Sequence, residues 1–189
     1  MLIADAQREL RLAFMGGFVA QLIEAGIWAL SAGVSLWAAP LYGMAVLFVA
    51  SAFLYPLTQL VLRLIGHNPA LSPGNTLGQL ATQLAFTVPV GFILVLAATL
   101  YRQTWFYPAS MIVVGAHYLP FVFLYGMRAF AALAVLMIAA GAGLGLYGPQ
   151  IFSLGGWVTA VLLVGFALVG LGVYRREVRR GQAATGLEQ

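Results

Sequence analysis

Two ionisable side chains stand inside long apolar stretches of this sequence, where they could carry protons or bind a ligand. Glu24 lies about midway along residues 13–37, and His117 lies about midway along residues 106–127. Histidine titrates near neutral pH and can exchange protons with a carboxylate. An ionisable group at mid-bilayer costs several kcal/mol unless it is paired or hydrated, so both side chains should face a bundle interior. Two alternatives stay open: a Glu24–His117 contact in a functional site, or two separate contacts that only join helices.

Three prolines stand near the middle of apolar stretches, each beside a polar side chain. Proline removes one helical N–H bond, and its ring clashes with the carbonyl four residues back. A carbonyl freed at membrane depth must bond a side chain or water, so such breaks favour a polar interior. Discontinuous helices also mark substrate sites in transporters, although a kink without function is the alternative. The expected helix breaks are at Pro56, Pro89 and Pro120.

Further polar side chains recur at helical spacing on the same stretches. Positions three or four residues apart share one face of a helix, which predicts a polar cavity among the first four spans, open toward the cytoplasm. Hydrogen bonds between helices, worth on the order of 0.6–2 kcal/mol each, are the alternative explanation. The side chains expected to bind a substrate or ion are Glu24, His117, Gln21, Tyr55, Gln59, Gln83, Thr87 and Tyr118.

The elements that carry these residues are expected to be membrane helices. Of the 189 residues, 62% are hydrophobic and 7% are charged, whereas soluble domains carry about 25% charged residues. The expected fold is therefore an all-α, polytopic transmembrane helical bundle, and the expected partner is the lipid bilayer. About 20 apolar residues cross a bilayer as a helix. Six stretches are long enough: 13–37, 41–65, 77–100, 106–127, 129–147 and 154–174.

The arginines predict which side of the membrane each loop faces. All nine basic residues are arginines, and six spans place only Arg102 on the side opposite the termini. Because basic loops stay in the cytoplasm, both termini are expected there. Arginine without lysine is typical of a GC-rich bacterial genome, which favours the bacterial cytoplasmic (inner) membrane. The other eight are Arg8, Arg11, Arg63, Arg128, Arg175, Arg176, Arg179 and Arg180.

Three regions divide the chain on this interpretation. Residues 1–12 are expected to form an amphipathic cytoplasmic lead-in, residues 13–174 the six-helix transmembrane domain, and residues 175–189 a basic cytoplasmic tail that binds anionic headgroups. Thr76 and Gln79 have capping-box spacing and predict the start of the third helix. Tyr107 is one of seven aromatic residues expected at the outer membrane interface.

Several kinds of site find no support in the sequence. Cysteine is absent, no Gly-rich phosphate loop is present, and one His with one Glu is too few ligands for zinc, so no cofactor or metal is expected. Nucleic acid is not expected, because the arginines sit at segment ends. Gly141 and Gly145 form a G-x-x-x-G, so the fifth and sixth spans are expected to be a packing scaffold or, alternatively, the face of a homo-oligomer.

One run of residues carries a family resemblance. Residues 75–80 read Asn-Thr-Leu-Gly-Gln-Leu, and residues 115–120 read Gly-Ala-His-Tyr-Leu-Pro, followed by Leu124-Tyr125. The pattern resembles a bacterial family of small multi-pass membrane proteins, the domain of unknown function family 7010, in which an Asn-Pro-Leu-Gly-like entry precedes a Gly-Ala-His-hydrophobic-Leu-Pro core. The resemblance implies a membrane protein with His117 and Pro120 in the family signature, and it implies no activity.

Three functional hypotheses follow from these residues. The first is a small-molecule or proton-coupled transporter, or a channel, which would use Glu24, His117 and the three prolines. The second is a non-transporting binding protein, sensor or accessory subunit. The third is an intramembrane enzyme, for which the sequence offers an acid and a base but no evident nucleophile or metal-ligand set.

Overall fold

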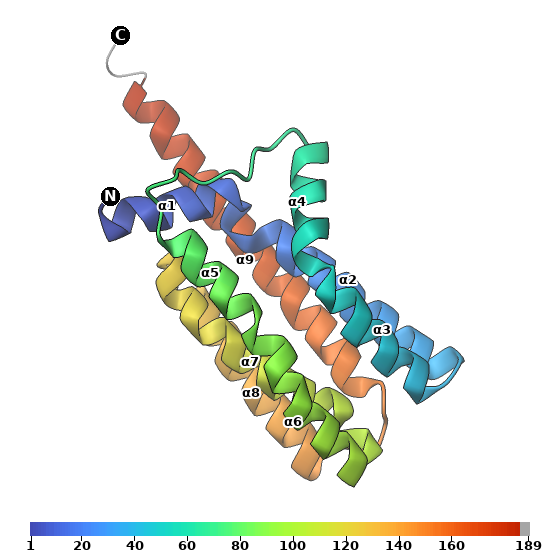
Figure 1. Ribbon diagram of the computed structural model, residues 1–189. Coiled ribbons are helices and arrows are strands. Elements are labelled where there is room, and N and C mark those ends of the chain that lie inside the picture. Colours follow the sequence, from blue (N-terminus) through green and yellow to red (C-terminus); the bar gives the residue numbers. More distant parts are fainter. Residues whose placement is uncertain (186–189) are drawn as a thin grey trace.

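A computed structural model describes residues 1–185 and is shown in Figure 1. Every regular element in this range is a helix, so the predicted all-α fold is confirmed. Five helical segments are long and apolar enough to cross a membrane, and a sixth results if one bent helix pair counts as a single span. The helices are α1 (Ile3–Ala13), η1 (Met15–Gly17), α2 (Phe18–Trp37), α3 (Pro40–Ala52), α4 (Leu54–Leu64), α5 (Leu77–Ala85), α6 (Thr87–Tyr101), η2 (Gln103–Trp105), α7 (Phe106–Tyr125), α8 (Ala129–Tyr147) and α9 (Leu154–Thr185).

Two of the three prolines interrupt their spans. Helix α3 ends at Ala52, and α4 leaves it with a bend of 60°; α5 likewise ends at Ala85. Each end lies four residues before a proline, at the carbonyl that the ring of Pro56 or Pro89 displaces. The prediction of a break at Pro120 was wrong, because α7 runs through this residue. A transmembrane helix tolerates proline where a neighbouring helix supports it, and α7 packs along α8.

Glycines allow α7 and α8 to pack closely. A Cβ atom built on Gly141 would lie 2.6 Å from the carbonyl oxygen of Pro108, and one on Gly115 would lie 3.0 Å from the Cβ of Met137. A Cβ on Gly145 would lie 3.4 Å from the Cβ of Pro108. The G-x-x-x-G motif therefore faces α7 within the same chain, so it does not supply a free face for a homo-oligomer.

A buried cluster of hydroxyl groups joins α2, α3 and α7. Ser31 Oγ donates to the carbonyl of Gly43 at 2.7 Å, and Ser35 Oγ donates to the carbonyl of Ser31 at 2.9 Å. The Tyr107 hydroxyl lies 2.6 Å and 2.9 Å from the two serine hydroxyls. Tyr107 is 0% exposed, so its ring packs inside the bundle, and its expected depth near the outer membrane interface stays a prediction. Its hydroxyl needs a buried partner, and the serines supply it.

Two glycines turn the chain from α1 into α2. Gly16 and Gly17 have φ angles of 65° and 86°, a left-handed conformation that glycine adopts without steric cost. Gly16 also lies against α9, where a Cβ atom on Gly170 would come within 2.5 Å of the Gly16 carbonyl oxygen. The backbones of η1 and α9 are therefore in direct contact, which fixes the angle at which α1 leaves the bundle.

Helix α1 also holds the segment that connects α4 to α5. The Glu9 carboxylate accepts hydrogen bonds from the backbone N–H of Ser72 at 2.6 Å and from the Asn75 side-chain amide at 2.7 Å. The Asn75 side-chain oxygen accepts from the N–H of Leu77 at 3.1 Å and caps α5. Thr76 was the expected cap, but it makes no side-chain cap bond. The side chain of Asn75 reaches the free N–H instead, and its amide faces α1.

The expected basic tail is a continuation of the last span. Helix α9 runs on to Thr185 without a break, and the last four residues of the expected tail lie outside the described residues. Glu177 on this extension forms a salt bridge of 2.7 Å with Arg11 of α1. The described N- and C-terminal segments thus lie at one end of the bundle, together with the α4–α5 connection, as Figure 1 shows.

Neutralising Glu9 should release the α4–α5 connection from α1. Hydrogen bonds from the backbone of Ser72 and the amide of Asn75 hold the pKa of the Glu9 carboxyl below its ordinary value of 4.5. A carboxyl group whose pKa is lowered by folding stabilises the folded state at pH values above its unfolded pKa. This stabilisation is lost as the pH falls, so we expect the α4–α5 connection to be released from α1 below pH 4.5. We expect Glu9→Gln to speed hydrogen exchange of Ser72 about tenfold at neutral pH. Asp5→Asn, at an exposed acid on the same helix, should change nothing; equal exchange in both variants would contradict the role of Glu9.

The contact between η1 and α9 makes a second prediction. Gly170→Ala should destabilise the protein by about 1–3 kcal/mol, because the added methyl group meets backbone atoms that cannot move aside. Gly172→Ala is the matched control two residues further along α9, where a Cβ atom has nothing within 4 Å. It should be neutral or slightly stabilising, since alanine favours helix. Thermal unfolding in mild detergent measures both, and equal midpoints would rule out the contact.

Candidate functional site

A hydrogen bond from α7 to Glu24 joins the middle parts of α2 and α7. The Tyr118 hydroxyl of α7 donates to a carboxylate oxygen of Glu24. Both side chains are buried, with exposed fractions of 9% and 4%. No arginine or histidine forms an ion pair with Glu24 in the described part of the chain. An isolated ionised carboxylate is costly in apolar surroundings, so the charge of Glu24 depends on whether water or a ligand reaches it.

His117 forms a second, separate contact, with Thr87 at the break between α5 and α6. The Thr87 hydroxyl donates its proton to the carbonyl of Leu84 at 2.7 Å. Its oxygen must therefore accept from His117, whose Nδ1 lies 2.9 Å away. We assign the proton of the neutral ring to Nδ1 on this basis, which leaves Nε2 with a free lone pair. His117 thus supports the broken span.

Glu24 and His117 have different hydrogen-bond partners. His117 and Tyr118 are successive residues of α7, and successive side chains of a helix point about 100° apart. Tyr118 therefore faces α2, and His117 faces α5 and α6. Of the two alternatives that the sequence left open, the structure has separate contacts and no Glu24–His117 hydrogen bond.

Gln21 adds an unsatisfied polar group near the Glu24 carboxylate. It lies one helical turn before Glu24 on α2 and is 3% exposed. Its side-chain oxygen is buried and has no hydrogen-bond partner among the described residues. Buried acceptors without a donor are uncommon, and this one would be stabilised by a water or a ligand donor.

The remaining expected binding residues lie toward the outside of the bundle. Tyr55 is 65% exposed, Gln83 and Thr87 are exposed, and Gln59 is half-buried. Among the described residues, none of these four side chains forms a hydrogen bond with Glu24, whose partner is Tyr118. The two cavities described for this structure are lined by other residues.

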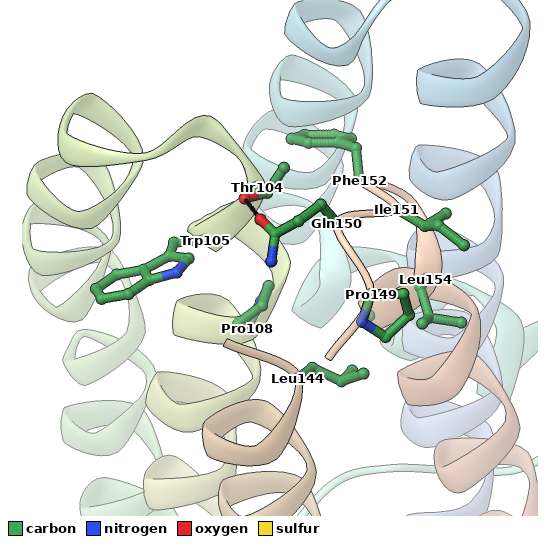
Figure 2. Close-up of a pocket in the computed structure, with 10 residues that line it drawn as sticks. Thr104, Trp105, Pro108, Leu144, Pro149, Gln150, Ile151, Phe152 and Leu154 are labelled. Carbon is green, nitrogen blue, oxygen red and sulfur yellow. Dashed lines mark hydrogen bonds between the residues drawn. The ribbon is translucent and has the colours of Figure 1, made fainter. Parts of the chain in front are cut away.

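One of these cavities is lined by residues of η2, the start of α7 and the α8–α9 connection, which Figure 2 shows as sticks. These elements lie at the end of the bundle opposite the termini (Figure 1). The Thr104 hydroxyl donates to the Gln150 side-chain oxygen across it at 2.9 Å. The indole N–H of Trp105, another lining residue, is buried without a partner among the described residues. The cavity volume is about 10 Å³, which is room for roughly one water molecule. It is too small for a substrate.

Sequence reasoning missed the hydroxyl cluster of Ser31, Ser35 and Tyr107. The spacing of the two serines, four residues apart in an apolar stretch, is a signal that places both on one helix face. It also missed the acidic and basic groups at the terminal end of the bundle, where Arg11 pairs with Glu177. Among the described residues, no group of three His, Asp or Glu side chains could hold a metal ion.

Comparison with known proteins shows which family the chain belongs to. The family model described as "Family of unknown function (DUF7010)" matches residues 3–171. The match begins with α1 and ends within α9, so it extends far beyond the run at residues 115–120. No curated protein and no solved structure matches the chain. The family resemblance of that run is confirmed: the chain belongs to DUF7010, a family of unknown function.

Proposed function

We propose that the chain is an integral protein of the bacterial cytoplasmic membrane with six spans and both termini in the cytoplasm. The bent pair α3–α4 counts as one span in this arrangement. The arrangement is supported by arginines on elements at the end that holds the termini, including Arg11 on α1 and Arg63 near the end of α4, whereas Arg102 follows α6 at the opposite end. Loops rich in arginine stay in the cytoplasm.

We further propose that the protein carries out proton-coupled or small-molecule transport, with Glu24 as the proton-carrying group. The hydrogen bond between Glu24 and Tyr118 carries this proposal, because it places an ionisable group without a cation partner in the bundle interior. Such residues in transporters form proton relays. Glu24 can take up or release a proton only when water reaches its carboxyl group. Because water can reach this group only when α2 and α7 separate, the charge of Glu24 is coupled to that separation.

The broken spans supply the positions at which such a separation could occur. Helices α3 and α4 meet at a 60° bend, and the α5–α6 break is supported by the bond from His117 to Thr87. A few residues at helix ends absorb the dihedral changes of such motions. A ligand or proton that reaches Nε2 of His117 would meet a free lone pair, so His117 is the second candidate proton carrier.

One observation favours a second candidate function. Glu24 and Tyr118 are both buried, with exposed fractions of 9% and 4%, which is also expected of a sensor or accessory subunit that does not transport. In that function the Glu24–Tyr118 bond would respond to proton concentration or to a partner without passing anything across the membrane.

Proton flux into vesicles tests the transport proposal. Purified protein is reconstituted with a trapped fluorescent pH indicator, and a pH gradient is imposed. We expect the wild type to dissipate the gradient, and Glu24→Gln to slow this at least about tenfold because the variant has no proton to carry. Tyr118→Phe should have an intermediate effect, since it keeps the carboxyl group but removes its partner.

The matched control for this test is Tyr125→Phe. Tyr125 is a buried tyrosine on the same helix, and its hydroxyl makes no hydrogen bond to the residues that the structure describes. This variant should transport like the wild type. Flux unchanged by Glu24→Gln would remove Glu24 from the mechanism, and a folded wild type without flux would favour the sensor or accessory function.

Single cysteines test the proposed orientation, because the chain has none of its own. Asn68, in the α4–α5 connection, and Gln103, at the opposite end, are both exposed. In intact spheroplasts, a membrane-impermeant maleimide should label Gln103→Cys, and it should label Asn68→Cys only after permeabilisation. The reverse pattern would place the termini outside, and labelling of both sites without permeabilisation would contradict an even number of spans.

A further inference from the structure

An open cavity of about 440 Å³ lies at the end of the bundle that holds the termini. Its wall is formed by α1, by the connection between α7 and α8, and by α9. The charged residues in this wall are Arg11, Arg128 and Glu177. The cavity is separate from the Glu24–Tyr118 contact, and its chemistry differs from one side of the wall to the other.

One side of the wall lacks a hydrogen-bond donor. The Arg11 Nε donates to Oε1 of Glu177 at 2.7 Å, and the Arg11 guanidinium also donates to the carbonyl of Tyr125 at 2.5 Å. The other carboxylate oxygen of Glu177 is buried and has no hydrogen-bond partner among the described residues. Leaving a buried acceptor unsatisfied costs about 1–3 kcal/mol, and more when the group is charged. A ligand that brings a donor to Glu177 would recover this energy.

The other side of the wall lacks an acceptor. Arg128 is exposed and forms no salt bridge within the part of the chain that the structure describes. The backbone N–H groups of Gly126, Met127 and Arg128 also donate to no backbone carbonyl there. Gly126 adopts a left-handed conformation directly after helical residues, and this sequence of conformations turns successive N–H groups toward one point, where an anion binds.

We propose that this cavity binds a zwitterionic headgroup, a phosphate linked to a primary ammonium, as in phosphatidylethanolamine. The phosphate would contact Arg128 and the N–H groups of the α7–α8 connection. The ammonium would donate to Glu177 after a rotation of its carboxyl group. A simple anion fits less well, since it leaves the free oxygen of Glu177 unsatisfied and is repelled by it.

The position of the cavity agrees with a lipid ligand. It lies where α7 ends and α8 begins, beside the extension of α9 that carries exposed Arg175 and Arg176. In the proposed membrane arrangement this is the depth of the cytoplasmic headgroups, where arginines bind anionic lipid groups. The volume of 440 Å³ exceeds that of phosphoethanolamine and leaves room for the attached glycerol. The proposal rests on the membrane arrangement and not on transport.

Lipid binding to the full chain in mild detergent tests the proposal without any flux measurement. Native mass spectrometry would compare phosphatidylethanolamine with phosphatidylglycerol, which has the phosphate but no ammonium. We expect the wild type to prefer phosphatidylethanolamine several-fold. Arg128→Gln should weaken binding of both lipids about tenfold, and Arg128→Lys should restore most of it. Arg63→Gln, at an exposed arginine that does not line the cavity, should change neither.

Glu177→Gln is the decisive variant, and its readout is the ratio of the two affinities. This variant also weakens the pair with Arg11, so a merely structural effect would lower binding of both lipids equally. The proposal instead expects the ratio to fall to about one. Equal binding of the two lipids by the wild type, or an unchanged ratio in Glu177→Gln, would overturn it.

Competition with soluble phosphoethanolamine distinguishes a membrane lipid from a free small molecule as the source of this headgroup. Failure of a large excess to displace phosphatidylethanolamine would support a membrane lipid as the ligand. Displacement at comparable concentrations would show that the same zwitterion binds without its acyl chains, which supports the chemistry of the site and assigns it to a free ligand.

Discussion

Hydrocarbon offers no hydrogen bonds, so each polar group in a membrane-spanning segment must find its partner within the protein. The interior polar contacts of this chain follow from that constraint. Ser31 and Ser35 donate their hydroxyl protons to nearby carbonyls, and the Tyr107 hydroxyl lies within hydrogen-bond distance of both serine oxygens. Toward the outside of the bundle, the exposed Thr87 donates to the carbonyl of Leu84 beside the α5–α6 break. The Glu24–Tyr118 bond satisfies the same requirement, and it differs from the others in that one partner can become charged.

Packing in lipid also gains little from hydrophobicity, because the lipid is as apolar as the side chains. The helices are held together instead by close contact between their backbones, which glycines on the facing helix surfaces allow. Gly16 meets Gly170 where α1 turns into the bundle, and Gly141 meets Pro108 between α7 and α8. The second contact packs α7 along α8, and the side chains of Tyr118 and Glu24 join α7 to α2.

The two ends of the bundle differ in the size of their cavities and in the polar groups that line them. The end opposite the termini has a cavity with room for about one water. The terminal end combines the bonds of α1 to the α4–α5 connection, the Arg11–Glu177 pair and a cavity of about 440 Å³. Arg128 is exposed at this end and one oxygen of Glu177 is buried without a partner among the described residues, so ligand recognition by polar contacts is expected at this end and proton chemistry in the interior.

Local rules in the sequence determined the helices, the uneven distribution of arginines and the two breaks four residues before Pro56 and Pro89, because each depends on neighbours along the chain. Tertiary structure alone decided which polar groups meet. Rotation of about 100° between successive residues of α7 turned Tyr118 toward Glu24 and His117 toward Thr87. Likewise, the packing of α8 turned Gly141 inward. Such choices depend on how helices rotate against one another, and that rotation is set by distant contacts such as Gly16 with Gly170.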